Sequence, residues 1–146
     1  MARRFALVGI CLIPYLASYL APALHFRLLS GGEKIMKGYE VAMLGALALL
    51  HLNVAWLANL LYLGSLVLVL GRLWRAAAVM ATLAALFGLH TLQLFSSTID
   101  VDPNMGRASP MLLSRFEPGF YLWMASFGLV LIVSLSCLRS ERTLGT

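Results

Sequence analysis

The chain has 146 residues, of which 61% are hydrophobic and 12% charged, and its formal net charge is +5. Water-soluble globular domains are about 45–50% apolar and about 25% charged, so this composition excludes a soluble enzyme, a disordered chain and a disulfide-rich scaffold. The basic residues are scattered rather than clustered, which argues against a nucleic-acid partner and leaves a single membrane domain, residues 1–146, as the prediction.

Four apolar stretches are long enough to cross a membrane as helices. A spanning helix needs roughly 20 mostly apolar residues, because the hydrocarbon core is about 30 Å thick. The stretches that meet this need are residues 5–23, 51–70, 76–95 and 119–138. The sequence therefore predicts an all-α integral membrane protein, built as a bundle of four transmembrane helices.

The first stretch, residues 5–23, has two interpretations. Two arginines, an apolar run and then Ala-Pro-Ala at 21–23 are also typical of a secretory signal peptide with a small-residue cleavage site. The apolar run is longer than the roughly 7–15 residues of a signal-peptide core, so we favour an uncleaved helix with a kink at Pro14. Cleavage would leave three spans with the same sidedness.

The second apolar stretch extends over residues 41–70 and is too long for one simple span. As a single helix it would measure about 45 Å. Counting back 20 residues from its end places the span at 51–70 and leaves 41–50 as a short interfacial or re-entrant segment. A long tilted helix that protrudes beyond the membrane is an equally good interpretation.

The distribution of Lys and Arg predicts the orientation of the bundle. If both termini are cytoplasmic, the short inner segments hold six basic residues, which are Arg3, Arg4, Arg72, Arg75, Arg139 and Arg142. The outer loops hold five basic residues, but these are spread over much longer segments. Because basic residues near helix ends favour the inner side, we expect both termini to be cytoplasmic.

Helices in lipid associate through small residues and polar contacts. Small residues recur at helical spacing in the third stretch, at Ala77, Ala81, Ala84, Ala85 and Gly88. The first two stretches carry polar and aromatic stripes, which we interpret mainly as bundle packing. The alternative is a small polar cavity for a ligand or an ion, whose walls would be Tyr15, Tyr19, Asn59 and Tyr62.

Three histidines, His25, His51 and His90, are the candidates for binding a cofactor. All three fall toward the outer side of the predicted spans, and imidazoles on facing helices can ligate haem or copper. The chain lacks a CxxCH motif for covalent haem. We therefore interpret the three as interfacial histidines and predict that no cofactor is bound.

Other patterns argue against catalysis, transport and metal binding. Asp100, Asp102 and Asn104 alternate as in a calcium loop, but position twelve is Met111, so we expect a solvated turn and no metal. No Asp, Glu, Lys or Arg lies within a predicted span, which argues against a pump or a secondary transporter. Because the chain also carries no hydrolase or phosphate-binding motif, we predict that it is not an enzyme.

Two segments resemble a pattern in uncharacterised small four-span proteins of the bacterial inner membrane. One is GYE at 38–40 followed by AWLAN at 55–59, and the other is GFYLWMAS at 119–126. The resemblance implies a bacterial plasma-membrane location and a four-span layout, and it implies no activity.

The expected function follows from abundant packing faces and from the lack of charged groups within the predicted spans. We expect a non-enzymatic accessory or assembly subunit, whose partners are the lipid bilayer and either another membrane protein or further copies of itself. One alternative is a membrane protein that binds a ligand, haem or a metal through the outer histidines. The other is a small oligomeric channel built on the alanine stripe of residues 77–88.

Overall fold

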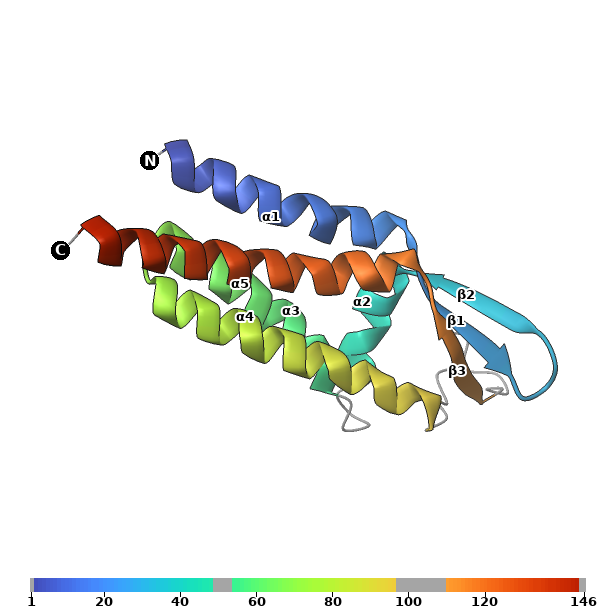
Figure 1. The fold of residues 1–146 in the computed structure, drawn as a ribbon. Coiled ribbons are helices and arrows are strands. Elements are labelled where there is room, and N and C mark those ends of the chain that lie inside the picture. The colour runs from blue at the N-terminus through green and yellow to red at the C-terminus, as the bar shows by residue number, and fades with distance from the viewer. Residues whose placement is uncertain (1, 49–53, 97–109, 145–146) are drawn as a thin grey trace.

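The computed structural model describes residues 2–48, 54–96 and 110–144, which are mostly helical (Figure 1). The α-helices are α1 (Ala2–Leu20), α2 (Gly38–Ala48), α3 (Leu57–Leu70), α4 (Trp74–Leu89) and α5 (Pro118–Leu144). Short 3₁₀ segments adjoin two of them, with η2 (Val54–Trp56) before α3 and η3 (His90–Phe95) after α4. The strands are β1 (Pro22–Leu28), β2 (Glu33–Lys37) and β3 (Met111–Phe116).

Four helices, α1, α3, α4 and α5, lie side by side in one bundle (Figure 1). Both termini lie at one end of this bundle and the strands lie at the other end. The bundle core combines aromatic rings with small side chains, and Tyr62, Phe127 and Ala58 are fully buried in it. We call the end that holds the termini the terminal end and the opposite end the sheet end.

The small residues of α4 lie against its neighbours. Ala77, Ala81, Ala84 and Gly88 are buried, and Ala85 is half-buried against the bundle core. Small side chains let helix backbones approach closely, and α4 packs against both α3 and α5. The stripe is therefore used in contacts within one chain.

The expectation of an all-α fold is wrong at the sheet end, where the strands form an antiparallel sheet in the order β2-β1-β3. The first helix ends at Leu20 rather than at residue 23, because Pro22 lacks the N–H that a helix needs and disfavours helical backbone in the residue before it. Gly31 and Gly32 adopt φ values of +87° and +123° in the β1–β2 turn, a conformation that other residues rarely accept.

The second apolar stretch does not form one long tilted helix. The Trp56 indole N–H donates a hydrogen bond of 3.0 Å to the Ala42 carbonyl oxygen, although 14 residues separate them. In a continuous helix the two residues would lie about 21 Å apart. Residues 41–48 instead belong to the separate helix α2, and the described part of the predicted span 51–70 begins at Val54.

Within the described residues, two helices are long and apolar enough to cross a membrane. They cover Trp74–Phe95, with 22 residues, and Pro118–Glu141, with 24 residues. They match the predicted spans 76–95 and 119–138 closely, although α5 continues beyond residue 138 to Leu144. Arg4–Leu20 and Val54–Leu70 are shorter apolar helices that pack in the same bundle.

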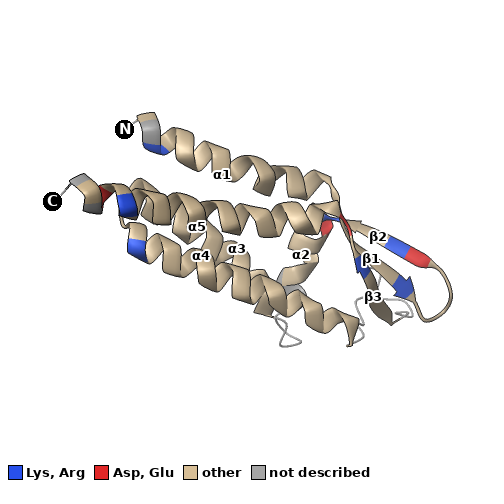
Figure 2. Cartoon of the chain, in the orientation of Figure 1, with Lys and Arg blue, Asp and Glu red and all other residues tan. Residues whose placement is uncertain are grey.

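The charged residues that the structure describes lie at the two ends of the molecule (Figure 2). At the terminal end the described side chains are Arg4, Arg72, Arg75, Arg139 and Glu141. The sheet end carries Arg27, Glu33, Lys34, Lys37, Glu40, Arg115 and Glu117. Between these two groups the described helices carry no Lys, Arg, Asp or Glu.

Candidate functional site

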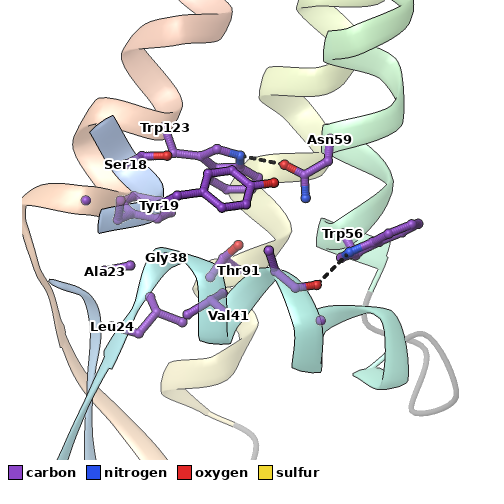
Figure 3. Close-up of a pocket in the computed structure, with 14 residues that line it drawn as sticks. Ser18, Tyr19, Ala23, Leu24, Gly38, Val41, Trp56, Asn59, Thr91 and Trp123 are labelled. Carbon is purple, nitrogen blue, oxygen red and sulfur yellow. Dashed lines mark hydrogen bonds between the residues drawn. The ribbon is translucent and has the colours of Figure 1, made fainter. Parts of the chain in front are cut away.

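The candidate site is a cavity of about 80 Å³ at the sheet end of the bundle (Figure 3). It lies where α1 ends, where α3 and α5 begin and where α4 passes into η3, and α2 contributes one wall. Most of the wall is apolar. The hydroxyl groups of Ser18, Tyr19 and Thr91 and the amide of Asn59 are its polar members.

A chain of hydrogen bonds ends at Asn59. The indole N–H of Trp123 donates to Asn59 Oδ1 over 2.9 Å, and the Tyr15 hydroxyl donates to the same oxygen over 3.1 Å. The Tyr15 and Tyr19 hydroxyl oxygens lie 3.1 Å apart. Because the single Tyr15 proton is used on Asn59, Tyr19 is the donor of this bond.

This network fixes which way the Asn59 amide faces. An indole nitrogen can donate a hydrogen bond but cannot accept one, so the atom that meets Trp123 is the amide oxygen. The NH₂ group of Asn59 therefore faces away from Trp123, and Figure 3 shows it on the side of Trp56 and Thr91. The site thus presents two N–H donors next to an apolar wall.

The four residues predicted from the sequence as cavity walls come together, but they have different roles. Tyr19 and Asn59 line the cavity. Tyr15 lies behind them and stacks on Tyr62, with ring centroids 4.5 Å apart. Tyr62 is fully buried and donates to the Cys11 carbonyl oxygen over 2.8 Å, so it belongs to the bundle core.

Trp123 and Thr91 are wall residues that the sequence did not identify as part of the site. Nothing in the local pattern around either residue indicates that it meets Asn59 or α2, because these contacts join helices that are distant in the sequence. Asn59 itself was detectable, as a polar residue within an apolar run.

The three predicted histidines differ in their surroundings. His25 is buried in β1, and its ring nitrogens lie 3.1 Å from Glu33 Oε2 and 3.2 Å from Glu117 Oε1. His90 begins η3, and its Nδ1 is buried without a hydrogen-bond partner in the described parts of the chain. His51 lies outside the described residues.

Electrostatics at His25 involve one further side chain. The Arg115 guanidinium bonds Glu117 over 2.8 Å and, together with His25, holds the pKa of the Glu117 carboxyl below its usual value of 4.5. Both ring nitrogens of His25 face carboxylate oxygens, so only the doubly protonated ring donates to both at once. The arrangement is a charged cluster that links all three strands.

Within residues 2–48, 54–96 and 110–144, no group of three or more His, Cys, Asp or Glu side chains could hold a metal ion. The calcium-like residues Asp100, Asp102 and Asn104 lie outside these ranges. Cys11 is buried, Cys137 is half-buried, and neither forms a disulfide.

Comparison with known proteins gave no relative. No family model, no curated protein and no solved structure matches the chain.

Proposed function

We propose that the chain is an integral protein of the bacterial inner membrane with four spans and both termini in the cytoplasm. The observation that carries this proposal is the separation of charge, which leaves an apolar zone between two charged ends (Figure 2). Only 33% of the most apolar 18-residue stretch of the helix Trp74–Phe95 is buried inside the protein, and only 22% of that of Pro118–Glu141. The outward-facing remainder needs an apolar solvent, which a bilayer supplies.

The two shorter helices share this environment. They pack alongside the long helices, and they also point large apolar side chains outward, including Ile13 and Leu16 on α1 and Leu63 and Val67 on α3. Helices that lie side by side with outward apolar faces need the same solvent. We therefore assign all four helices of the bundle to the membrane.

The proposed activity is that of an accessory or assembly subunit that acts without catalysis. The sheet, which lies beyond the apolar zone, supports this proposal. Its strands are joined directly to helices, since β1 follows α1, β2 leads into α2 and β3 leads into α5. A partner that binds the sheet is thereby connected to three helices. Among the strands that the structure describes, β2 and β3 form the two edges of the sheet, and an edge strand can pair with a strand of another protein.

Cysteine labelling tests the topology. In a chain with both native cysteines replaced by Ala, Ser30→Cys lies in the β1–β2 turn and Ser140→Cys lies at the terminal end of α5. We expect a membrane-impermeant maleimide to label the first variant in intact spheroplasts and the second only after permeabilisation. Labelling of both in intact spheroplasts, or release of the protein by alkaline carbonate, would contradict the proposal.

Native mass spectrometry of the tagged protein, gently extracted from its host membrane, tests the partner. We expect a reproducible added mass that matches another polypeptide. Ile35→Asp alters an exposed position on the open edge strand β2 and should reduce that added mass, whereas Leu29→Asp alters an exposed position outside the strands and serves as the matched control. A bare monomer in every preparation would contradict the subunit proposal.

A ligand-binding role is the second candidate, and the cavity at Asn59 favours it. We do not propose a channel built on the alanine stripe, because Ala77, Ala81 and Ala84 are buried within one chain. His25 engages two carboxylates through its ring nitrogens, so the geometry gives no support to haem or metal binding through this histidine.

A further inference from the structure

The amide of Asn59 has two hydrogen-bond donors with no partner in the described part of the chain. Its oxygen already accepts from Trp123 and Tyr15, and Trp123 fixes the NH₂ group toward the cavity side. An amide N–H placed against apolar side chains costs free energy unless an acceptor meets it. The natural occupant of this position is therefore an oxygen acceptor.

The rest of the cavity wall defines the remainder of the occupant. No charged side chain among the described residues lines the cavity, so this wall offers nothing that would compensate an ionised ligand. Leu24, Val41 and Phe120 give it an apolar surface. The volume of about 80 Å³ is far below the roughly 300–1,000 Å³ of a site that encloses a whole ligand. The cavity thus suits the uncharged, narrow part of a larger amphiphile.

The depth of the cavity identifies the kind of amphiphile. Two of its wall residues adjoin the charged sheet end, since Gly38 follows Lys37 directly and Gly119 comes two residues after Glu117. Asn59 and Phe120 belong to the apolar helices below. In the orientation proposed above, this boundary coincides with the border between the headgroups and the hydrocarbon, where the ester carbonyls of glycerolipids lie.

We propose that the cavity binds the acyl-ester group of a membrane glycerolipid, whose carbonyl oxygen accepts a hydrogen bond from Asn59 Nδ2 while the adjoining methylenes contact the apolar wall. The inference rests on the proposed membrane insertion. It assigns to Asn59 the role of anchor and to Trp123 and Tyr15 the role of positioning residues, because they hold the amide oxygen and so aim the NH₂ group.

A lipid competition measures this contact directly. The full-length, delipidated protein in detergent is mixed with equal amounts of a diacyl phosphatidylethanolamine and its dialkyl ether analogue, which lacks the carbonyl groups, and the adducts are resolved by native mass spectrometry. One neutral hydrogen bond corresponds to about a fivefold preference for the ester lipid. Equal binding of the two lipids by the unmodified protein would overturn the proposal.

Three variants locate the effect. Asn59→Leu should abolish the ester preference, and Thr82→Val, which removes an α4 hydroxyl that bonds the Ala78 carbonyl oxygen and does not line the cavity, should retain it. Val41→Phe fills the cavity without altering the hydrogen-bond chain, so it should reduce binding of both lipids and remains informative if Asn59→Leu fails to fold. Unchanged lipid binding by Val41→Phe would also overturn the proposal.

Flotation with phosphatidylethanolamine vesicles separates this inference from the proposed function. Protein that floats with the vesicles but shows no ester preference contradicts the lipid site alone. Protein that remains in the dense fraction contradicts membrane insertion, and with it both proposals.

Discussion

At the scale of single residues, one donor-only side chain determines the chemistry of the site. Trp123 fixes the orientation of Asn59, which fixes the proton on Tyr15 and then the proton on Tyr19. The sequence could predict that Tyr15, Tyr19 and Asn59 share a region, because helical spacing puts the tyrosines on one face. It could not predict the direction of the chain, because Trp123 lies 64 residues from Asn59.

The charged cluster around Glu117 predicts a pH dependence of stability. Arg115 and His25 hold the Glu117 pKa below its usual value of 4.5, so the folded protein releases this proton more readily than the unfolded chain. The resulting stabilisation is fully present above the unfolded pKa and is lost as the pH falls through the folded pKa. We expect the Tm to decrease at pH values below about 4.5, and to decrease less steeply in the Glu117→Gln variant.

Thermal unfolding in detergent between neutral and acid pH measures this effect. Glu40→Gln is the matched control. In the described parts of the chain the Glu40 carboxylate accepts a hydrogen bond from the Lys37 backbone N–H and has no ion-pair partner. Identical pH profiles for the unmodified protein and Glu117→Gln would show that the cluster does not stabilise the fold.

At the scale of elements, the long helices could be predicted and the sheet could not. The apolar runs at 76–95 and 119–138 are long enough to identify α4 and α5 by themselves. The strands have five to seven residues and adjoin helices, and β1 pairs with β3 across about 90 residues, as in the His25–Arg115 pair. Such pairing is not encoded in a local pattern, although Gly31 and Gly32 mark the hairpin turn.

The junction between β2 and α2 depends on a glycine. A Cβ atom on Gly38 would overlap the Ser18 carbonyl oxygen and lie 2.9 Å from Tyr19 Cα, and neither backbone atom can move independently of α1. Gly38→Ala should therefore destabilise the protein by about 1–3 kcal/mol. The measurement is unfolding in a mixed detergent–denaturant series.

Gly128→Ala is the control for this substitution. Gly128 lies within α5, and a Cβ atom there would meet nothing within 4 Å. Because Ala favours helix over Gly, this variant should be neutral or slightly more stable. If Gly38→Ala were as stable as Gly128→Ala, the close approach of β2, α2 and α1 would be wrong.

At the scale of the whole molecule, the four helices of the bundle differ in length. The apolar part of α1 covers Arg4–Leu20, or about 25 Å, and is followed by strand β1, whereas the two long helices measure about 33–36 Å. A helix that is too long for a bilayer can tilt or extend past it, but a helix that is too short draws polar groups into the hydrocarbon. The short helix α1 therefore sets the thickness that the protein prefers.

This difference predicts that the protein is most stable in a thin bilayer. Reconstituted into phosphatidylcholine vesicles of increasing acyl-chain length, it should show a Tm that falls once the hydrocarbon exceeds about 25 Å, the length of the apolar part of α1, at a cost of fractions of a kcal/mol per Å. Arg4→Leu tests this prediction, because it lengthens the apolar part of α1 at its exposed end and removes a hydrogen bond to the Leu70 carbonyl oxygen. In Arg4→Leu the Tm should fall less steeply with thickness than in the unmodified protein. A Tm that rises steadily with bilayer thickness in both proteins would show instead that the long helices α4 and α5 determine the fit.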